Sequence, residues 1–173
     1  PASQGGAMTT TLITGGNRSL GLETARRLIQ AGHTVYAGMR DPESGDAARA
    51  LGARVLRVDV TDQRSVEAAF AELPELDVLV NNAGILGTAY GVDDLDADAM
   101  ATVLDTNVTG IVRVTQAALP LLRRSANPVI VNVASGAGLV GVRRGAAYAA
   151  SKGGVIALTR QMAVDLAASG VRV

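Results

Sequence analysis

The chain has 173 residues, of which 48% are hydrophobic and 18% are charged, as is typical of one globular domain with a substantial core. Sixteen basic residues balance sixteen acidic ones, which argues against nucleic acid or an anionic membrane as a partner. There is no cysteine, so disulfides, thiolate metal sites and a cysteine nucleophile are excluded. The single histidine, His33, cannot form a metal cluster alone, and we expect it in an exposed turn.

The beginning of the chain has no targeting pattern. Residues 1–7 lack the charged and apolar regions of a signal peptide and precede Met8, so we interpret them as a non-native or disordered head. No apolar run reaches the ~20 residues of a membrane span, and we expect a cytoplasmic protein with no membrane partner. Residues 8–173 are predicted to form a single domain.

Short β-rich runs alternate with helical patterns along this domain. We predict strands at 9–14, 34–40, 53–59, 77–81, 128–134 and 171–173, and helices at 19–31, 45–51, 62–71, 96–123 and 148–169. Asp62 is placed as a helix N-cap, and Gly32 and Gly52 as helix ends. Because the strands are apolar nearly throughout, the pattern predicts an α/β fold. Its doubly wound parallel sheet has helices on both faces and breaks off in the sixth strand.

Ligands of such sheets bind outside the carboxyl ends of the strands, and the first strand ends in T-G-G-N-R-S-L-G, from Thr14 to Gly21. Glycines let the backbone approach a ligand, and the amides at the start of the next helix favour a phosphate. No G-K-[ST] follows, which excludes a P-loop, and the spacing differs from G-x-G-x-x-G. By itself the stretch is equally compatible with a simple tight turn.

Four polar residues further along form a possible catalytic set. Tyr148 and Lys152, in Y-A-A-S-K, lie one helical turn apart, and Ser135 ends an apolar strand. Asn107 lies inside the predicted helix 96–123, where asparagine is a poor helix former. Each has a simpler explanation when taken alone: a surface pair on a helix, a hydroxyl that binds a loop amide, and a helix kink.

Together these motifs resemble the short-chain dehydrogenase/reductase family in its ordinary short form, with its T-G-x-x-x-G-x-G turn and Y-x-x-x-K pair. Asp59-Val60 after the third strand and N-N-A-G at Asn81–Gly84 add to the resemblance, which covers nearly all of residues 8–173. It implies a Rossmann fold, no metal, and a nicotinamide-dependent oxidoreductase that interconverts a carbonyl and a secondary alcohol by hydride transfer. The implied cofactor-binding residues are Gly15, Asn17, Arg18, Ser19, Leu20, Gly21, Arg40, Asp59, Val60, Asn82, Ala83, Gly84, Tyr148 and Lys152.

The resemblance also implies a role for each member of the catalytic tetrad. Tyr148 is the general acid in reduction and the general base in oxidation, because a neighbouring ammonium, Lys152, favours its phenolate. Lys152 also binds the nicotinamide ribose. Ser135 binds the substrate oxygen, and Asn107 positions a water that relays protons to Lys152.

Two positions bear on the choice of cofactor. Ser19 replaces the middle glycine of the family's turn, and we predict that binding is retained with altered affinity. At the end of the second strand, Met39 occupies the position of the acidic residue that binds the ribose of NAD, and Arg40 follows it. With Arg18, this favours NADP(H) over NAD(H). A shift of one residue would place Asp41 at the ribose instead.

Members of this family normally continue through a Pro-Gly loop, a mobile substrate segment and a seventh strand, which are not in this sequence. Either the sequence is a fragment, or the substrate pocket lacks a wall and the sheet keeps an exposed edge, in which case we expect weak or no turnover and a tendency to associate. The substrate is a small carbonyl or alcohol that faces residues 136–147. There, Arg143 and Arg144 either meet an acidic group or are solvated. We expect a homodimer or homotetramer through helices 96–123 and 148–169. The alternatives are a catalytically impaired NADP(H)-binding regulator or scaffold, and an extended-type sugar-nucleotide epimerase or dehydratase.

Overall fold

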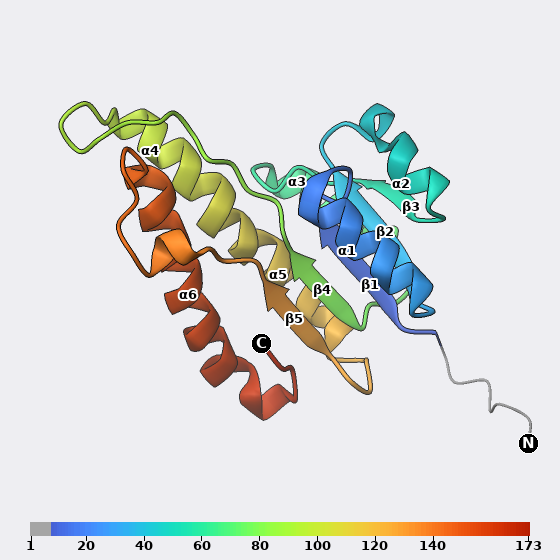
Figure 1. The fold of residues 1–173 in the computed structure, drawn as a ribbon. Helices are drawn as coiled ribbons and strands as arrows, with labels where there is room; N and C mark the ends of the chain where they lie inside the picture. Colours follow the sequence, from blue (N-terminus) through green and yellow to red (C-terminus); the bar gives the residue numbers. More distant parts are fainter. Residues whose placement is uncertain (1–7) are drawn as a thin grey trace, which may run out of the picture.

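The computed structural model describes residues 8–173, so the interpretation of residues 1–7 lies outside the described residues. Five parallel strands form one sheet in the order β3-β2-β1-β4-β5 (Figure 1). The strands are β1 (Thr10–Thr14), β2 (Thr34–Met39), β3 (Arg54–Arg57), β4 (Val78–Asn81) and β5 (Val129–Asn132). The α-helices are α1 (Ser19–Gln30), α2 (Asp46–Ala50), α3 (Gln63–Ala71), α4 (Ala97–Leu104), α5 (Gly110–Leu122) and α6 (Ala146–Leu166). The predicted doubly wound sheet is confirmed, with its strand order reversing direction between β1 and β4.

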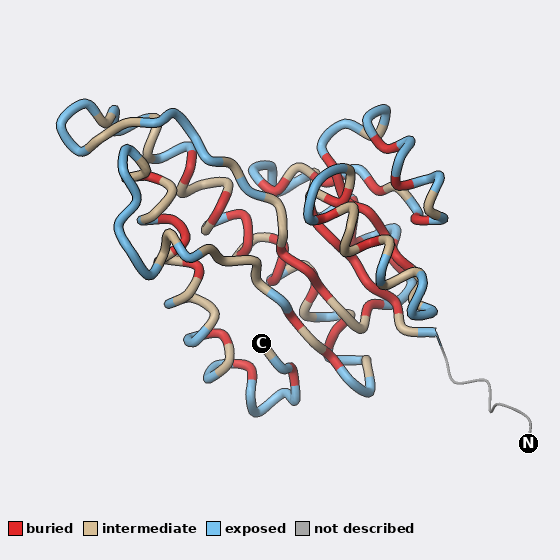
Figure 2. Tube along the Cα trace, in the orientation of Figure 1, coloured by how far each residue is buried: buried red, intermediate tan, exposed pale blue. Residues whose placement is uncertain are grey.

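Alternation along each strand divides the core between the two faces of the sheet. Leu12 of β1 packs in one cluster with side chains of α3, α5 and α6, whereas its neighbour Ile13 packs in another with side chains of α1 and α2. All of β1 is buried, as its position at the centre of the sheet requires (Figure 2). The nearly continuous apolar runs of the central strands therefore reflect helices on both faces.

The sheet is less covered at β5, its edge, than at its centre. Val131 of β5 is 44% exposed, because α1 and α2, which cover that face of the sheet, contact β1, β2 and β3 and do not reach β5. At residues 171–173, where the sequence predicts the beginning of a sixth strand, Arg172 pairs with Val129 of β5 in one parallel bridge.

Three local predictions at helix ends are confirmed and one at a turn is wrong. Asp62 caps α3 by accepting a hydrogen bond from the Arg64 amide at 2.9 Å. Gly32 and Gly52 have φ of +87° and +92°, the left-handed geometry that ends helices. His33 is half-buried rather than exposed, because its Nδ1 lies 2.9 Å from Thr11 Oγ1.

The predicted helix 96–123 is continuous but not uniform. A π-helical segment, Asp105–Thr109, separates α4 from α5, and the buried Asn107 is at its centre. Such segments insert an extra residue into the helical repeat and are frequent at functional sites. The helix is therefore locally underwound around Asn107, a poor helix former.

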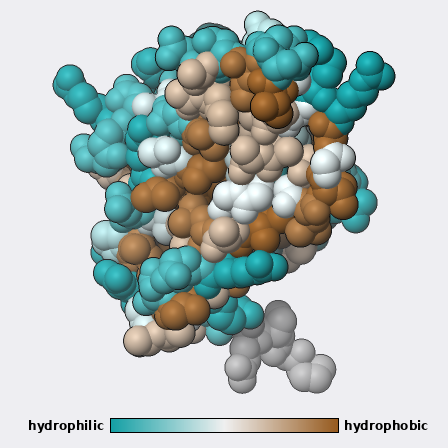
Figure 3. All heavy atoms as spheres, turned by 90° about the vertical axis from the view of Figure 1, so that its left-hand side faces the viewer, coloured by the Kyte–Doolittle hydropathy of each residue, from teal (hydrophilic) through white to brown (hydrophobic). Residues whose placement is uncertain are grey.

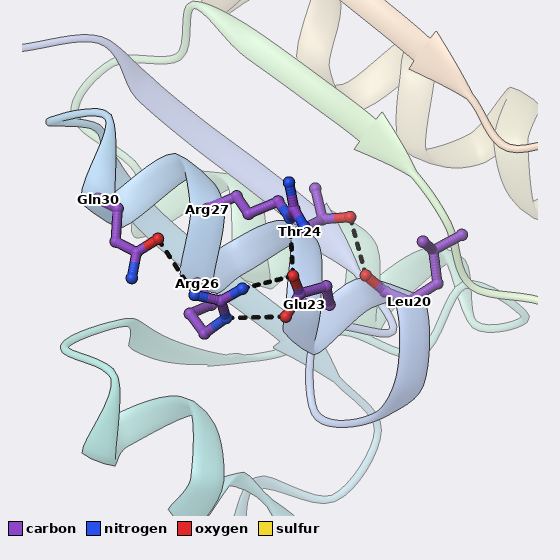
Figure 4. A network of polar contacts seen from close by, with 6 residues as sticks. All are labelled: Leu20, Glu23, Thr24, Arg26, Arg27 and Gln30. Carbon is purple, nitrogen blue, oxygen red and sulfur yellow. Dashed lines mark hydrogen bonds and ion pairs between the residues drawn. The ribbon is translucent and has the colours of Figure 1, made fainter.

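Helix α1 has a charged network on its outer side (Figure 4). Arg26 binds both carboxylate oxygens of Glu23, at 2.6 and 2.8 Å, and Arg27 binds one at 2.7 Å. These hydrogen bonds, of which that from Arg26 has the larger effect, lower the pKa of Glu23 to about 2.

Among the described residues, no helix is both long and apolar enough to cross a bilayer.

Candidate active site

A cavity of about 800 Å³ opens where β1, β2 and β4 end at their carboxyl side and extends to the start of α6. This is where open parallel α/β sheets bind their ligands. The cavity is lined by every residue that the family resemblance assigns to cofactor binding: Gly15, Asn17, Arg18, Ser19, Leu20, Gly21, Arg40, Asp59, Val60, Asn82, Ala83, Gly84, Tyr148 and Lys152.

The glycine turn brings the backbone close to its neighbours. Gly15 has φ of +69°, and its amide donates to the Gly38 carbonyl of β2 at 2.8 Å. A Cβ on Gly21 would lie 2.2 Å from the Gly15 carbonyl oxygen, so only glycine fits there. The glycines therefore allow the turn to pack tightly against the ends of β2 and β4, at the wall of the cavity.

The start of α1 is suited to an anion. Its N-cap residue, Arg18, makes no side-chain cap, and the first turn contains no acidic residue. The first amides of the helix have no intrahelical acceptor, so they are available to a phosphate beside Gly15. Ser19 makes no cap hydrogen bond to the helix and has φ of +47°, the region that glycine favours.

Polar side chains line the wall beyond β2. Arg18 and Arg40 are both exposed and both line the cavity. Asp41 also lines it, but its Oδ1 accepts from the Glu43 amide at 3.0 Å and so caps the 3-10 helix Pro42–Gly45. The Asp41 carboxylate is thus already engaged in a local turn.

Thr14 and Asn82 join the glycine turn to the end of β4. The Thr14 hydroxyl accepts from the Asn82 and Ala83 amides at 3.1 and 3.0 Å. In return, Asn82 Nδ2 donates to the carbonyls of Thr14 and Gly15 at 2.9 and 3.1 Å. The two strand ends form one rigid wall of the cavity.

Tyr148 and Lys152 project from the first turns of α6 into the same cavity. The Lys152 Nζ lies over the Tyr148 ring, 5.7 Å from its centroid, and donates to the Val133 carbonyl at 2.7 Å. Lys152, the only lysine of the chain, is buried, and the loss of hydration lowers its pKa. The phenol therefore has a basic nitrogen beside it in a partly dehydrated site.

Asn107 lies behind these residues and does not line the cavity among the described residues. Its Oδ1 accepts from the Ile85 amide and its Nδ2 donates to the Ile85 carbonyl, both at 2.8 Å. Nδ2 also donates to Ser151 Oγ at 3.0 Å. Its side chain is thus joined to the loop after β4 and to α6.

Ser135 is the N-cap residue of the short 3-10 helix Gly136–Gly138 and is half-buried. It does not itself line the cavity, whereas its neighbour Ala134 does. Its Oγ accepts from the Ala137 amide at 3.2 Å and donates to no described protein group. Gly138 lets this loop pack directly against α6, because a Cβ there would lie 2.5 Å from the Lys152 carbonyl carbon.

Arg144 is not simply solvated. It donates to Asp94 Oδ2 at 2.6 Å and to the Ala89 carbonyl at 2.9 Å, and the ion pair lowers the pKa of Asp94.

Several polar residues near the cavity were not singled out from the sequence: Ser44, Thr61, Thr102, Thr106 and Ser151. Ser44 and Thr61 each follow a strand that ends at this edge of the sheet, which is a signal that the sequence does contain. Thr102 and Thr106 are one helical turn apart, and nothing local distinguishes them from surface threonines.

A parallel doubly wound sheet with a glycine turn and a polar cavity at its carboxyl edge defines a dinucleotide-binding α/β protein of the Rossmann type. The family model for short chain dehydrogenase matches residues 9–173. A cis-4-hydroxycyclohexanecarboxylate dehydrogenase of Sinomonas cyclohexanicum is 41% identical over 171 residues, which span 94% of this chain and 69% of that protein. A cyclopentanol dehydrogenase of Comamonas testosteroni is 39% identical, over 94% of this chain and 68% of that protein.

Solved structures agree with this assignment. An NAD+-bound xylitol dehydrogenase has a TM-score of 0.88 at 35% identity, over 95% of this chain and 67% of that chain. An actinorhodin polyketide ketoreductase variant with NADPH has a TM-score of 0.88 at 34% identity, over 95% of this chain and 67% of that chain. The chain belongs to the short chain dehydrogenase family and is an oxidoreductase that acts on alcohol and carbonyl groups. It spans about two thirds of the length of these relatives.

Proposed function

We propose that this protein interconverts a ketone and a secondary alcohol with NADP(H), using Tyr148 as the general acid and base. The observation that carries the proposal is that Tyr148 and Lys152 line the same cavity as the glycine turn. When bound, NADP(H) supplies or accepts the hydride. The uncapped start of α1 would hold its pyrophosphate, and the Lys152 ammonium would bind the nicotinamide ribose.

The chain's own residues account for the proton. In reduction, the Tyr148 hydroxyl gives its proton to the carbonyl oxygen, and the adjacent Lys152 ammonium stabilises the charge that this leaves. In oxidation, the same oxygen takes the proton of the alcohol. Ser135 has a free hydroxyl proton, which can hydrogen-bond to the substrate oxygen and orient it.

Preference for NADP(H) over NAD(H) rests on two cationic side chains at one wall. Arg18 and Arg40 both reach the cavity beyond β2, and Asp41 is engaged in capping a 3-10 helix. A 2′-phosphate there would meet two guanidinium groups, which bind phosphate through paired hydrogen bonds. Asn17 and Ser44, joined by a 3.0 Å hydrogen bond, would form the floor beneath it.

The substrate is proposed to be an apolar ketone or alcohol such as a ring alcohol. Exposed apolar side chains occupy the loops that follow β4 and β5, and one of them, Leu86, lines the cavity: Leu86, Val92, Leu139, Val140 and Val142. The cyclopentanol and hydroxycyclohexanecarboxylate dehydrogenases described above have names consistent with such a substrate. Apolar side chains also gather on the face of the molecule that includes α4 and α6 (Figure 3). Val164, in α6, is 73% exposed. We propose that this face pairs with a second copy, which Val164→Glu should oppose in light scattering.

The test of the chemistry is oxidation of cyclopentanol and reduction of cyclopentanone, with NADP(H) and NAD(H) compared in each direction. Tyr148→Phe should lose at least ~10³-fold in kcat and keep its NADPH dissociation constant within about two-fold. Tyr36→Phe is the matched control, because this buried tyrosine accepts a hydrogen bond from Arg54 of β3 and is not among the residues that line the cavity. NADPH binding without turnover of any carbonyl would favour a binding protein, and a lower KM for NADH would refute the cofactor assignment.

A further inference from the structure

Ser151 is a buried polar residue to which the proposed mechanism gives no role. It lies between Tyr148 and Lys152 in the helical repeat and is 0% exposed. Because residues three and four apart share one side of a helix, Ser151 and Lys152 both adjoin Tyr148. A hydroxyl buried at such a position must be hydrogen-bonded or it destabilises the fold.

The Ser151 hydroxyl both donates and accepts a hydrogen bond. It donates to the Tyr148 carbonyl at 2.7 Å, within its own helix, and accepts from Asn107 Nδ2 at 3.0 Å. The first bond fixes the direction of the hydroxyl proton, and so leaves its lone pair aimed at the π-helical segment. Ser151 thereby connects α6 with the segment between α4 and α5.

The connection continues to the loop after β4. The other hydrogen of Asn107 Nδ2 goes to the Ile85 carbonyl and its Oδ1 accepts from the Ile85 amide, so all of its amide hydrogens are committed. A Cβ placed on Gly84 would lie 3.2 Å from Asn107 Oδ1 and 3.7 Å from Lys152 Nζ. The backbone of residues 84–85, which lines the cavity, therefore lies close to the lysine.

We propose that Ser151 is a positioning residue: its hydroxyl clamps Asn107, and through it the Gly84–Ile85 loop, to the helical turn that carries Tyr148 and Lys152. This inference rests on the proposed function for its catalytic consequence and on the hydrogen bonds alone for the clamp. Without the hydroxyl, one hydrogen of the Asn107 amide has no buried acceptor, and the loop is no longer held in register with Lys152.

Thr159 provides a matched control on the same helix. It also donates to a carbonyl of α6, that of Val155, at 2.7 Å, and also accepts from an asparagine amide, that of Asn132, at 3.0 Å. It lies two helical turns beyond Ser151 and does not line the cavity among the described residues. Thr159→Ala therefore removes the same kind of hydroxyl away from the site.

The experiment compares Ser151→Ala, Ser151→Cys and Thr159→Ala by steady-state kinetics and by NMR-detected hydrogen exchange of the Ile85 amide. Ser151→Ala should lower kcat about 10-fold, with KM for both substrates within about two-fold of the original. It should also speed exchange of the Ile85 amide about 10-fold. Ser151→Cys keeps the shape and weakens both hydrogen bonds, so it should give intermediate values, and it decides the case if Ser151→Ala does not fold. Thr159→Ala should leave kcat and the exchange rate within about two-fold.

Unchanged Ile85 exchange in both Ser151 variants would overturn the clamp. Equal losses of kcat in Thr159→Ala and Ser151→Ala would also overturn it, because they would show a general effect of helix stability. The exchange measurement needs no turnover, so an inactive wild-type protein would refute the proposed function and still leave the clamp to be judged.

Discussion

Replacing Ser19 by glycine should stabilise the protein and tighten cofactor binding. Ser19 has φ of +47°, is exposed, and begins α1 beside the proposed pyrophosphate site. Its hydroxyl makes no side-chain cap for the helix. The side chain therefore strains the backbone without a compensating contact among the described residues.

The size of the effect follows from two opposing contributions. A left-handed conformation costs a residue with a Cβ about 1–2 kcal/mol, which glycine does not incur. Glycine gives back about 0.4–1 kcal/mol through the greater freedom of the unfolded chain. The net gain is about 0.5–1 kcal/mol, which for a chain of this length raises Tm by about 2–3 °C.

Thermal unfolding followed by circular dichroism measures the first effect, and titration with NADPH, followed by its fluorescence, measures the second. Ser19→Ala is the control, because it removes the hydroxyl and keeps the Cβ, so its Tm should stay within about 1 °C. NADPH should bind Ser19→Gly about 2- to 5-fold more tightly, since the turn no longer has a Cβ near the phosphate path. A Tm of Ser19→Gly at or below that of the wild type, with Ser19→Ala unchanged, would refute the argument from backbone strain.

Three further changes test other parts of the structure. Gly138→Ala should lower the free energy of unfolding by about 2 kcal/mol and kcat about 10-fold, because its Cβ would strike the backbone at Lys152. Gly141→Ala is the control: a Cβ there has nothing within 4 Å, so neither quantity should change in the same assays. Lys152→Met should abolish turnover yet raise stability to urea by about 1 kcal/mol, since it removes a poorly hydrated cation; a loss of stability would contradict this. Because the neutral amine is favoured by burial, the single lysine ε-methylene signal in NMR should titrate below the usual range for lysine. Glu23→Gln should lower Tm slightly at neutral pH, because it removes the ion pairs with Arg26 and Arg27. The difference in Tm should vanish as the pH falls from 4.5 towards 2, where the Glu23 carboxylate, whose pKa is lowered to about 2, becomes protonated. A constant difference in Tm across that interval would show that these ion pairs do not act on stability.

The order of strands and helices was readable from the sequence because local patterns record local constraints. Runs such as V-L-V-N at β4 are apolar on both sides, as a strand between two layers of helices must be. Asp62 and Gly52 mark helix ends through their own hydrogen bonds and φ angles. The motif residues of the first strand and of Y-A-A-S-K could be placed for the same reason, since each belongs to one continuous segment.

What the sequence could not indicate depends on residues far apart in the chain. Nothing in a linear reading says that Ser151 meets Asn107, 44 positions earlier, or that Asp41 is occupied in a cap. The exposure of Val131 is equally invisible, because it depends on how far α1 and α2 extend across the sheet.

The sequence by itself therefore determined the α/β class, the glycine turn and the tyrosine–lysine pair, since periodicity, backbone freedom and helical spacing act within a few residues. Only the tertiary structure decided which side chains share the cavity, which hydroxyls are already engaged, and that a π-helical segment places Asn107 against Ser151 and Ile85. Those outcomes depend on packing between distant segments, where burial and hydrogen-bond satisfaction are settled for the whole molecule at once.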